Sequence, residues 1–190
     1  MESIRLNFYY ICSMIIKFRL ISPEEENFVR DIEISGDDSF LDLHEAIQAA
    51  CDYDPSMLTA FYVSNNHWDK GQEIVLQIMD EDEQKDSLLM DETIISSFYS
   101  KKGEKLIYIY DFFSVRHFLL EVVNVRQADA ADANLSYPIC TLCSGIAPQQ
   151  IKVDEISAAG YSDDLSDEFD ELDLDEEDFE NFDSIDNYDL

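Results

Sequence analysis

The sequence has little positive charge. Only 12 of its 190 residues are Lys or Arg, against 43 Asp or Glu, and the formal net charge at pH 7 is −31. Direct binding to a nucleic-acid backbone needs clustered basic side chains, and here only Lys101, Lys102 and Lys105 cluster. The charge therefore argues against direct nucleic-acid binding and favours a basic protein as partner.

Glycine, histidine and cysteine are also scarce. Five scattered glycines exclude a glycine-rich phosphate loop, and no nucleophile–histidine arrangement is recognisable around the three histidines. We therefore expect neither an enzymatic activity nor a cofactor.

The four cysteines do not form a disulfide framework, and the sequence has neither a convincing secretory signal nor a run of about 20 apolar residues. This pattern indicates a reduced, cytosolic protein without a membrane segment.

The clearest secondary-structure signal is an amphipathic helix that begins after Ser39. Ser39 is a good N-cap, and Asp42 three residues later gives a start that resembles a capping box. Pro55 and the residue before it should end the helix. We expect Gln48 on the polar face and His44 at the boundary between the faces. Apolar residues spaced by three and four define the buried face: Phe40, Leu43, Ile47, Ala50 and Cys51.

Segments with strand composition surround this helix. They occupy residues 15–21, 28–34, 58–63, 73–79, 105–113 and 117–125. Residues 90–99 carry apolar side chains at helical spacing and predict a second, short helix, whereas residues 137–148 are expected to be irregular. The order ββα-ββ-α-ββ predicts an α+β domain, with a mixed or antiparallel sheet of about six strands and the main helix across one face.

The chain is expected to have three parts. Residues 1–13 are a candidate N-terminal extension, because Met14 begins a natural first strand and would then be the true start. The alternative is an extra edge strand over residues 4–11. Residues 14–150 form the α+β domain, and residues 151–190 form an acidic tail.

The tail carries the sharpest functional signal. Fifteen of the 43 acidic residues lie between Tyr161 and Leu190, interleaved with apolar side chains. Like charges at this density oppose collapse, so the tail should be disordered on its own. Such alternation is typical of segments that bind basic partners, although a purely solubilising role is the alternative. The residues expected to contact a partner are Phe169, Leu172, Phe179 and Phe182.

Three short motifs resemble a known family. LHEAIQ at residues 43–48 is followed by LTAF at 58–61, YIYDF at 108–112 is followed by His117, and YPIC occupies 137–140. In this order they resemble the plasmid pRiA4b ORF-3-like family, whose members are sometimes labelled insertion-element passenger TnpR proteins. The resemblance implies a fold; the label does not establish recombinase chemistry.

The sequence also departs from the family pattern. Met57 and Thr59 stand where the family tends to have histidine, Phe113 and Ser114 replace Gly-Asp, and Arg116 replaces Trp. The sequence therefore resembles a divergent member of the family, in which several polar groups of the motifs are missing.

Two weaker chemical hypotheses follow from the motif positions. A metal site would use His44, Asp111, His117 and Cys140, although both histidines are better explained as structural hydrogen-bonding groups. Cys140 and Cys143 form a CxxC motif, which is half a zinc site, a redox pair or a coincidence.

The leading interpretation is a non-enzymatic cytosolic interaction module. The first alternative is a metal-dependent catalytic or metal-binding domain. The second is an accessory factor in mobile-element DNA transactions that acts through a basic protein.

Overall fold

The computed structural model describes residues 14–78 and 87–151. The chain divides into two units, Met1–Ile151 and Lys152–Leu190, and every described residue belongs to the first. The candidate N-terminal extension, with its alternative strand, and the acidic tail after Ile151 lie outside the described residues.

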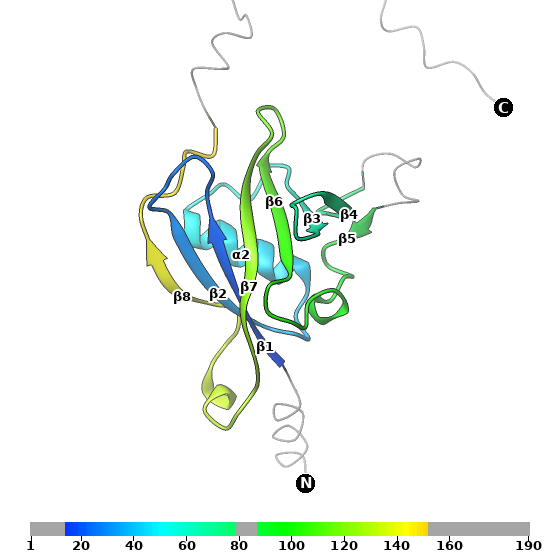
Figure 1. Ribbon diagram of the computed structural model, residues 1–190, viewed down its shortest axis with the longest axis vertical. Helices are drawn as coiled ribbons and strands as arrows, with labels where there is room; N and C mark the ends of the chain where they lie inside the picture. Colours follow the sequence, from blue (N-terminus) through cyan, green and yellow to red (C-terminus); the bar gives the residue numbers. More distant parts are fainter. Residues whose placement is uncertain (1–13, 79–86, 152–190) are drawn as a thin grey trace, which may run out of the picture. The chain divides into compact units, whose positions relative to one another are not determined.

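Eight strands form one sheet in the described part of the chain (Figure 1). The sheet order is β5-β4-β3-β6-β7-β1-β2-β8, and only the β4–β5 pair is parallel. The predicted α+β class is confirmed, with eight strands in place of about six. The strands are β1 (Met14–Ile21), β2 (Val29–Ser35), β3 (Ala60–Ser64), β4 (Lys70–Val75), β5 (Leu88–Leu89), β6 (Lys105–Asp111), β7 (Arg116–Gln127) and β8 (Ile139–Ser144).

Helix α2 (Phe40–Cys51) crosses one face of this sheet (Figure 1). The predicted capping box is confirmed, because the Asp42 amide donates to Oγ of Ser39 and the Ser39 amide donates to Oδ2 of Asp42. The helix ends at Asp52, which adopts a left-handed conformation with φ of 56°. None of the helices in the described residues is long and apolar enough to cross a membrane.

The predicted second helix over residues 90–99 is wrong. This segment contains only a 3₁₀ turn at Ile95–Ser97. Its backbone carbonyls bond the start of α2 instead: Phe40 donates to Thr93 at 2.9 Å, and Leu41 donates to Met90 at 3.0 Å. The apolar side chains whose spacing suggested a helix are instead buried from an irregular segment that packs against the start of α2.

Residues 137–148, which we expected to be irregular, contain the edge strand β8. It pairs antiparallel with β2. Its side chains are almost all exposed, so the sequence lacks the apolar alternation by which a half-buried strand is recognised. The strand exists because β2 offers it a hydrogen-bonding edge.

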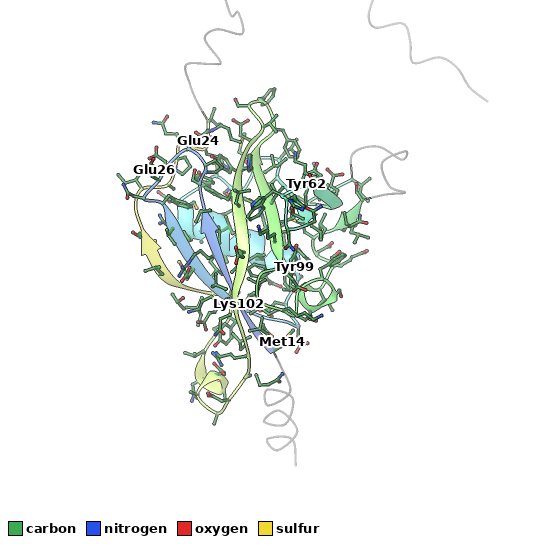
Figure 2. The ribbon with its side chains drawn as sticks, in the orientation of Figure 1. Met14, Glu24, Glu26, Tyr62, Tyr99 and Lys102 are labelled. Atoms are coloured by element: carbon green, nitrogen blue, oxygen red, sulfur yellow. The ribbon has the colours of Figure 1, made fainter. Side chains whose placement is uncertain are left out.

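Aromatic side chains fill the core between α2 and the sheet. The Phe118 ring stacks on Phe28 with ring centroids 4.9 Å apart and lies 4.6 Å from Tyr110. Tyr99, marked in Figure 2, packs edge-on against Phe18 at 5.3 Å. Each fully buried large apolar side chain contributes roughly 1.5–3 kcal/mol to folding, so this core holds the helix against the strands.

Candidate functional site

Four polar side chains meet in the core between α2 and the sheet. His44 and Gln48 lie one turn apart on α2, Thr59 immediately precedes β3, and Tyr108 comes from β6. The Tyr108 hydroxyl lies 2.9 Å from Nδ1 of His44 and accepts a hydrogen bond from Nε2 of Gln48 at 2.5 Å. The Thr59 hydroxyl lies 3.3 Å from the same His44 nitrogen. All four side chains are buried, and we call them the α2 polar cluster.

Burial decides the protonation states in the α2 polar cluster. It lowers the pKa of His44 from 6.5 to about 4 and raises the pKa of Tyr108. Both groups are therefore neutral at pH 7, and the Tyr108 hydroxyl shares a hydrogen bond with Nδ1 of His44. The cluster contains no carboxylate that could act as an acid–base partner of the imidazole. The contacts fix α2 on β6.

The position of Gln48 corrects the sequence prediction. We expected its side chain on the polar face of α2, but it is buried with only 4% of its surface exposed. Its Oε1 atom has no hydrogen-bond partner among the described residues. His44, expected at the boundary between the faces, is buried as well.

The side chains considered as metal ligands lie apart. His44 is in the core, whereas Nδ1 of His117 lies 3.1 Å from the Val115 carbonyl on the hairpin. Asp111 accepts hydrogen bonds from the turn between β6 and β7, and Cys140 lies on β8, which β1 and β2 separate from β7. In the described part of the chain, no group of three His, Cys, Asp or Glu side chains is placed to hold a metal.

Arg116 ties the β6–β7 hairpin to two other segments. Its Nε and Nη2 atoms donate to the Glu24 carboxylate at 2.8 and 3.1 Å, and its Nη1 atom donates to the Gln150 carbonyl at 3.3 Å. Asp111 lies 3.9 Å from the same Nη1 atom. Glu24 lies at the same end of the sheet as the hairpin turn (Figure 2). The buried Arg116 guanidinium thus holds the start of β7 beside Gln150, near the end of the described residues.

The turn of this hairpin exposes three large apolar side chains. Phe113 is 97% exposed, Val115 55% and Phe112 43%. We expected the strand to continue to residue 113, but β6 ends at Asp111, whose carboxylate accepts from the Phe113 amide at 2.9 Å and so shapes the turn. Figure 1 shows the hairpin extending past its neighbouring strands. We call Phe112, Phe113 and Val115 the β6–β7 tip.

The CxxC motif lies on an edge strand. Cys140 and Cys143 are exposed on β8, and Cys51 is buried at the C-terminal end of α2. Thioredoxin-like CxxC motifs instead open a helix after a strand. The tail residues expected to contact a partner, Phe169, Leu172, Phe179 and Phe182, lie outside the described residues.

A family model described as plasmid pRiA4b ORF-3-like protein matches residues 13–188. The chain belongs to this family. The match extends beyond the three motifs and includes most of the segment assigned to the acidic tail.

A solved structure supports the same fold. The pRiA4b ORF-3-like chain resembles a protein of unknown function, MM3350 from Methanosarcina mazei Go1, with a TM-score of 0.56, 22% identity and 88% of each chain covered. At this identity the likeness concerns the fold alone. No curated protein gives a significant match.

The pRiA4b ORF-3-like motifs supply the α2 polar cluster. His44 and Gln48 belong to the first motif and Tyr108 to the second, while Thr59 stands where the resemblance places a histidine in relatives. Sequence reasoning did not group these residues. The spacing of four between His44 and Gln48 was a usable signal, because it places both on one helix face. Tyr108 is 64 residues from His44, and no local pattern connects them.

Proposed function

We propose that this pRiA4b ORF-3-like chain is a non-enzymatic protein-interaction module that binds a basic partner through the β6–β7 tip and the acidic tail. The β6–β7 tip carries this proposal, because Phe113 is 97% exposed at the end of a projecting hairpin. Exposed aromatic side chains gain much free energy when a partner covers them, and they dominate many interfaces.

The charge of the chain supports a basic partner. With 43 acidic and 12 basic residues, the chain attracts positively charged surfaces and accelerates encounter with them. The matching surface is an apolar groove rimmed by Lys and Arg. A basic DNA-binding protein with such a groove would connect the chain to mobile-element DNA transactions without direct contact to DNA. We propose a cytosolic setting for this interaction.

Comparative affinity purification from the native cell tests the proposal. The baits are the full chain, Phe113→Ser, a chain lacking residues 161–190, and Leu135→Ser. Leu135 is a matched control, because it is also an exposed apolar residue (45%) and lies in the loop after β7, away from the hairpin turn. We expect the full chain and Leu135→Ser to bind the same basic proteins. Recovery of these proteins on Phe113→Ser should be about tenfold lower than on the full chain. This difference should be larger at high salt.

Two results would contradict the proposal. Unchanged partners on Phe113→Ser and on the truncated chain would remove the β6–β7 tip and the tail from the interaction. A mobility shift of duplex DNA by the purified chain at low salt would show the direct nucleic-acid binding that its charge opposes.

A further inference from the structure

A β-bulge places Cys140 and Cys143 on the same face of β8. Successive side chains of a strand alternate between its faces, so residues three apart normally point in opposite directions. Here the pairing with β2 shifts register, since Cys143 pairs with Arg30 and Cys140 with Ile32, leaving Thr141 as the extra residue. Arg30 and Ile32 are buried towards α2, so both cysteines lie on that side of the edge strand.

The two thiols interact with each other and are open to reagents. The Cys143 side chain contacts the Cys140 thiol, which also donates to the Leu142 carbonyl at 3.3 Å. Both residues are exposed, and β8 is the last strand of the sheet among the described residues. Cys51 lies nearby, but it is only 7% exposed and burial raises its pKa to about 12. A small oxidant therefore reaches the pair on β8 and not Cys51.

A buried guanidinium lies beside the pair. Arg30 is 5% exposed, and its positive charge lowers the pKa of Cys140, partly offsetting the rise caused by burial and by Cys143. Every hydrogen bond that the structure gives Arg30 ends on a backbone oxygen, so its charge remains available to a thiolate. The acceptors are the carbonyls of Val29, Ala50, Ser144 and Gly145.

We propose that Cys140 and Cys143 form a redox-active dithiol that a low-molecular-weight disulfide oxidises to an intramolecular disulfide. Three features of the fold support this assignment: the bulge that aligns the two side chains, their contact at an open sheet edge, and the guanidinium beside them.

Cys143 reacts first, because the thiol of Cys140 is held in a hydrogen bond to the Leu142 carbonyl. The Cys143 thiolate attacks one sulfur of the small disulfide, a mixed disulfide forms, and one small thiolate leaves. Cys140 then loses its proton to solvent and its thiolate attacks Sγ of Cys143, releasing the second small thiolate. Two electrons pass to the small disulfide, and the two protons lost by the cysteines are available to the two released thiolates.

Oxidised glutathione applied to the reduced full chain tests this inference. Intact mass and peptide mapping should show the loss of two hydrogens in the peptide that contains both cysteines, without an added glutathione. The Cys140→Ser variant should accumulate glutathione on Cys143, at least about tenfold more than the unmodified sequence does. The Cys51→Ala variant should form the same disulfide as the unmodified sequence.

Other products would overturn the inference. Stable glutathione on Cys143 of the unmodified chain would show that Cys140 does not reach it. A disulfide that includes Cys51 or Cys12 would show that a different pair reacts. Since Cys140 and Cys143 are exposed, substitutions there should leave the fold intact, which far-ultraviolet circular dichroism checks.

Discussion

At the scale of single residues, the α2 polar cluster shows how burial determines what a histidine does. The imidazole of His44 has 2% of its surface exposed, and its Nδ1 atom lies 2.9 Å from the Tyr108 hydroxyl. A protonated imidazole would be poorly solvated in the core. The native structure therefore requires neutral His44.

This requirement makes stability depend on pH. The pKa of His44 is about 4 in the folded chain and 6.5 for an exposed histidine. Between these values the unfolded chain binds the proton and the folded chain does not, so stability is fully present above pH 6.5 and falls as the pH drops towards 4. The shift corresponds to a loss of about 3 kcal/mol. Urea unfolding at a series of pH values measures it.

Two variants isolate the contribution of His44. His44→Asn keeps an acceptor near the place of Nδ1 but does not titrate, so its stability curve should be flatter than that of the native chain between pH 6.5 and 4. His117→Asn makes the same substitution outside the α2 polar cluster, on the hairpin, and serves as the control variant. Parallel curves for the native chain and His44→Asn would show that His44 does not account for the loss.

At the scale of elements, β8 is held in place by hydrogen bonds from other elements rather than by burial of its own side chains. Arg30 of β2 donates to the carbonyls of Ser144 and Gly145 at the end of β8 and to the Ala50 carbonyl at the end of α2. A single buried side chain thus joins two strands and a helix. Gly145 makes the close approach feasible, because its φ is +68° and it lies against the backbone of Asn27.

We expect Gly145→Ala to destabilise the domain more than a comparable glycine substitution elsewhere. A Cβ atom at position 145 would lie 2.3 Å from the Asn27 carbonyl oxygen, so the backbone must move. Gly103 is the matched control, because its φ is +91° and a Cβ atom there would meet no atom within 4 Å. Gly103→Ala should cost about 1 kcal/mol and Gly145→Ala more than about 2 kcal/mol in urea unfolding. Equal losses would show that β8 accommodates the extra carbon.

At the scale of the whole molecule, uneven charge is the dominant feature. Fifteen acidic residues lie between positions 161 and 190, a segment that contains no Lys or Arg. Repulsion among like charges opposes compaction and weakens as salt is added. The family match extends to residue 188 and so includes most of this segment.

Removing residues 161–190 should leave the stability of the domain unchanged at high salt and raise it slightly at low salt. The reason is that truncation removes self-repulsion and leaves every described side chain of the core in place. Thermal unfolding of the full and truncated chains at two salt concentrations measures this. A clear loss of stability in both conditions would show that the segment is part of the folded domain.

The local sequence pattern was sufficient to predict some of these elements. The helix at Phe40–Cys51 follows from apolar spacing and from the pairing of Ser39 with Asp42, all within one short segment. The strand composition of residues 28–34 likewise predicted the strand β2. These features depend on residues a few positions apart, where periodicity and capping act.

Contacts between residues far apart in the chain determined the features that the local pattern did not predict. β8 forms because it pairs with the free edge of β2. Residues 90–99 accept hydrogen bonds from the start of α2 and do not form a helix of their own. The Gln48 side chain is buried because it donates a hydrogen bond to the Tyr108 hydroxyl. The contact between Cys140 and Cys143 depends on one register shift against β2. Such contacts join residues far apart in the chain, and their energies depend on burial and register, which only the folded structure contains.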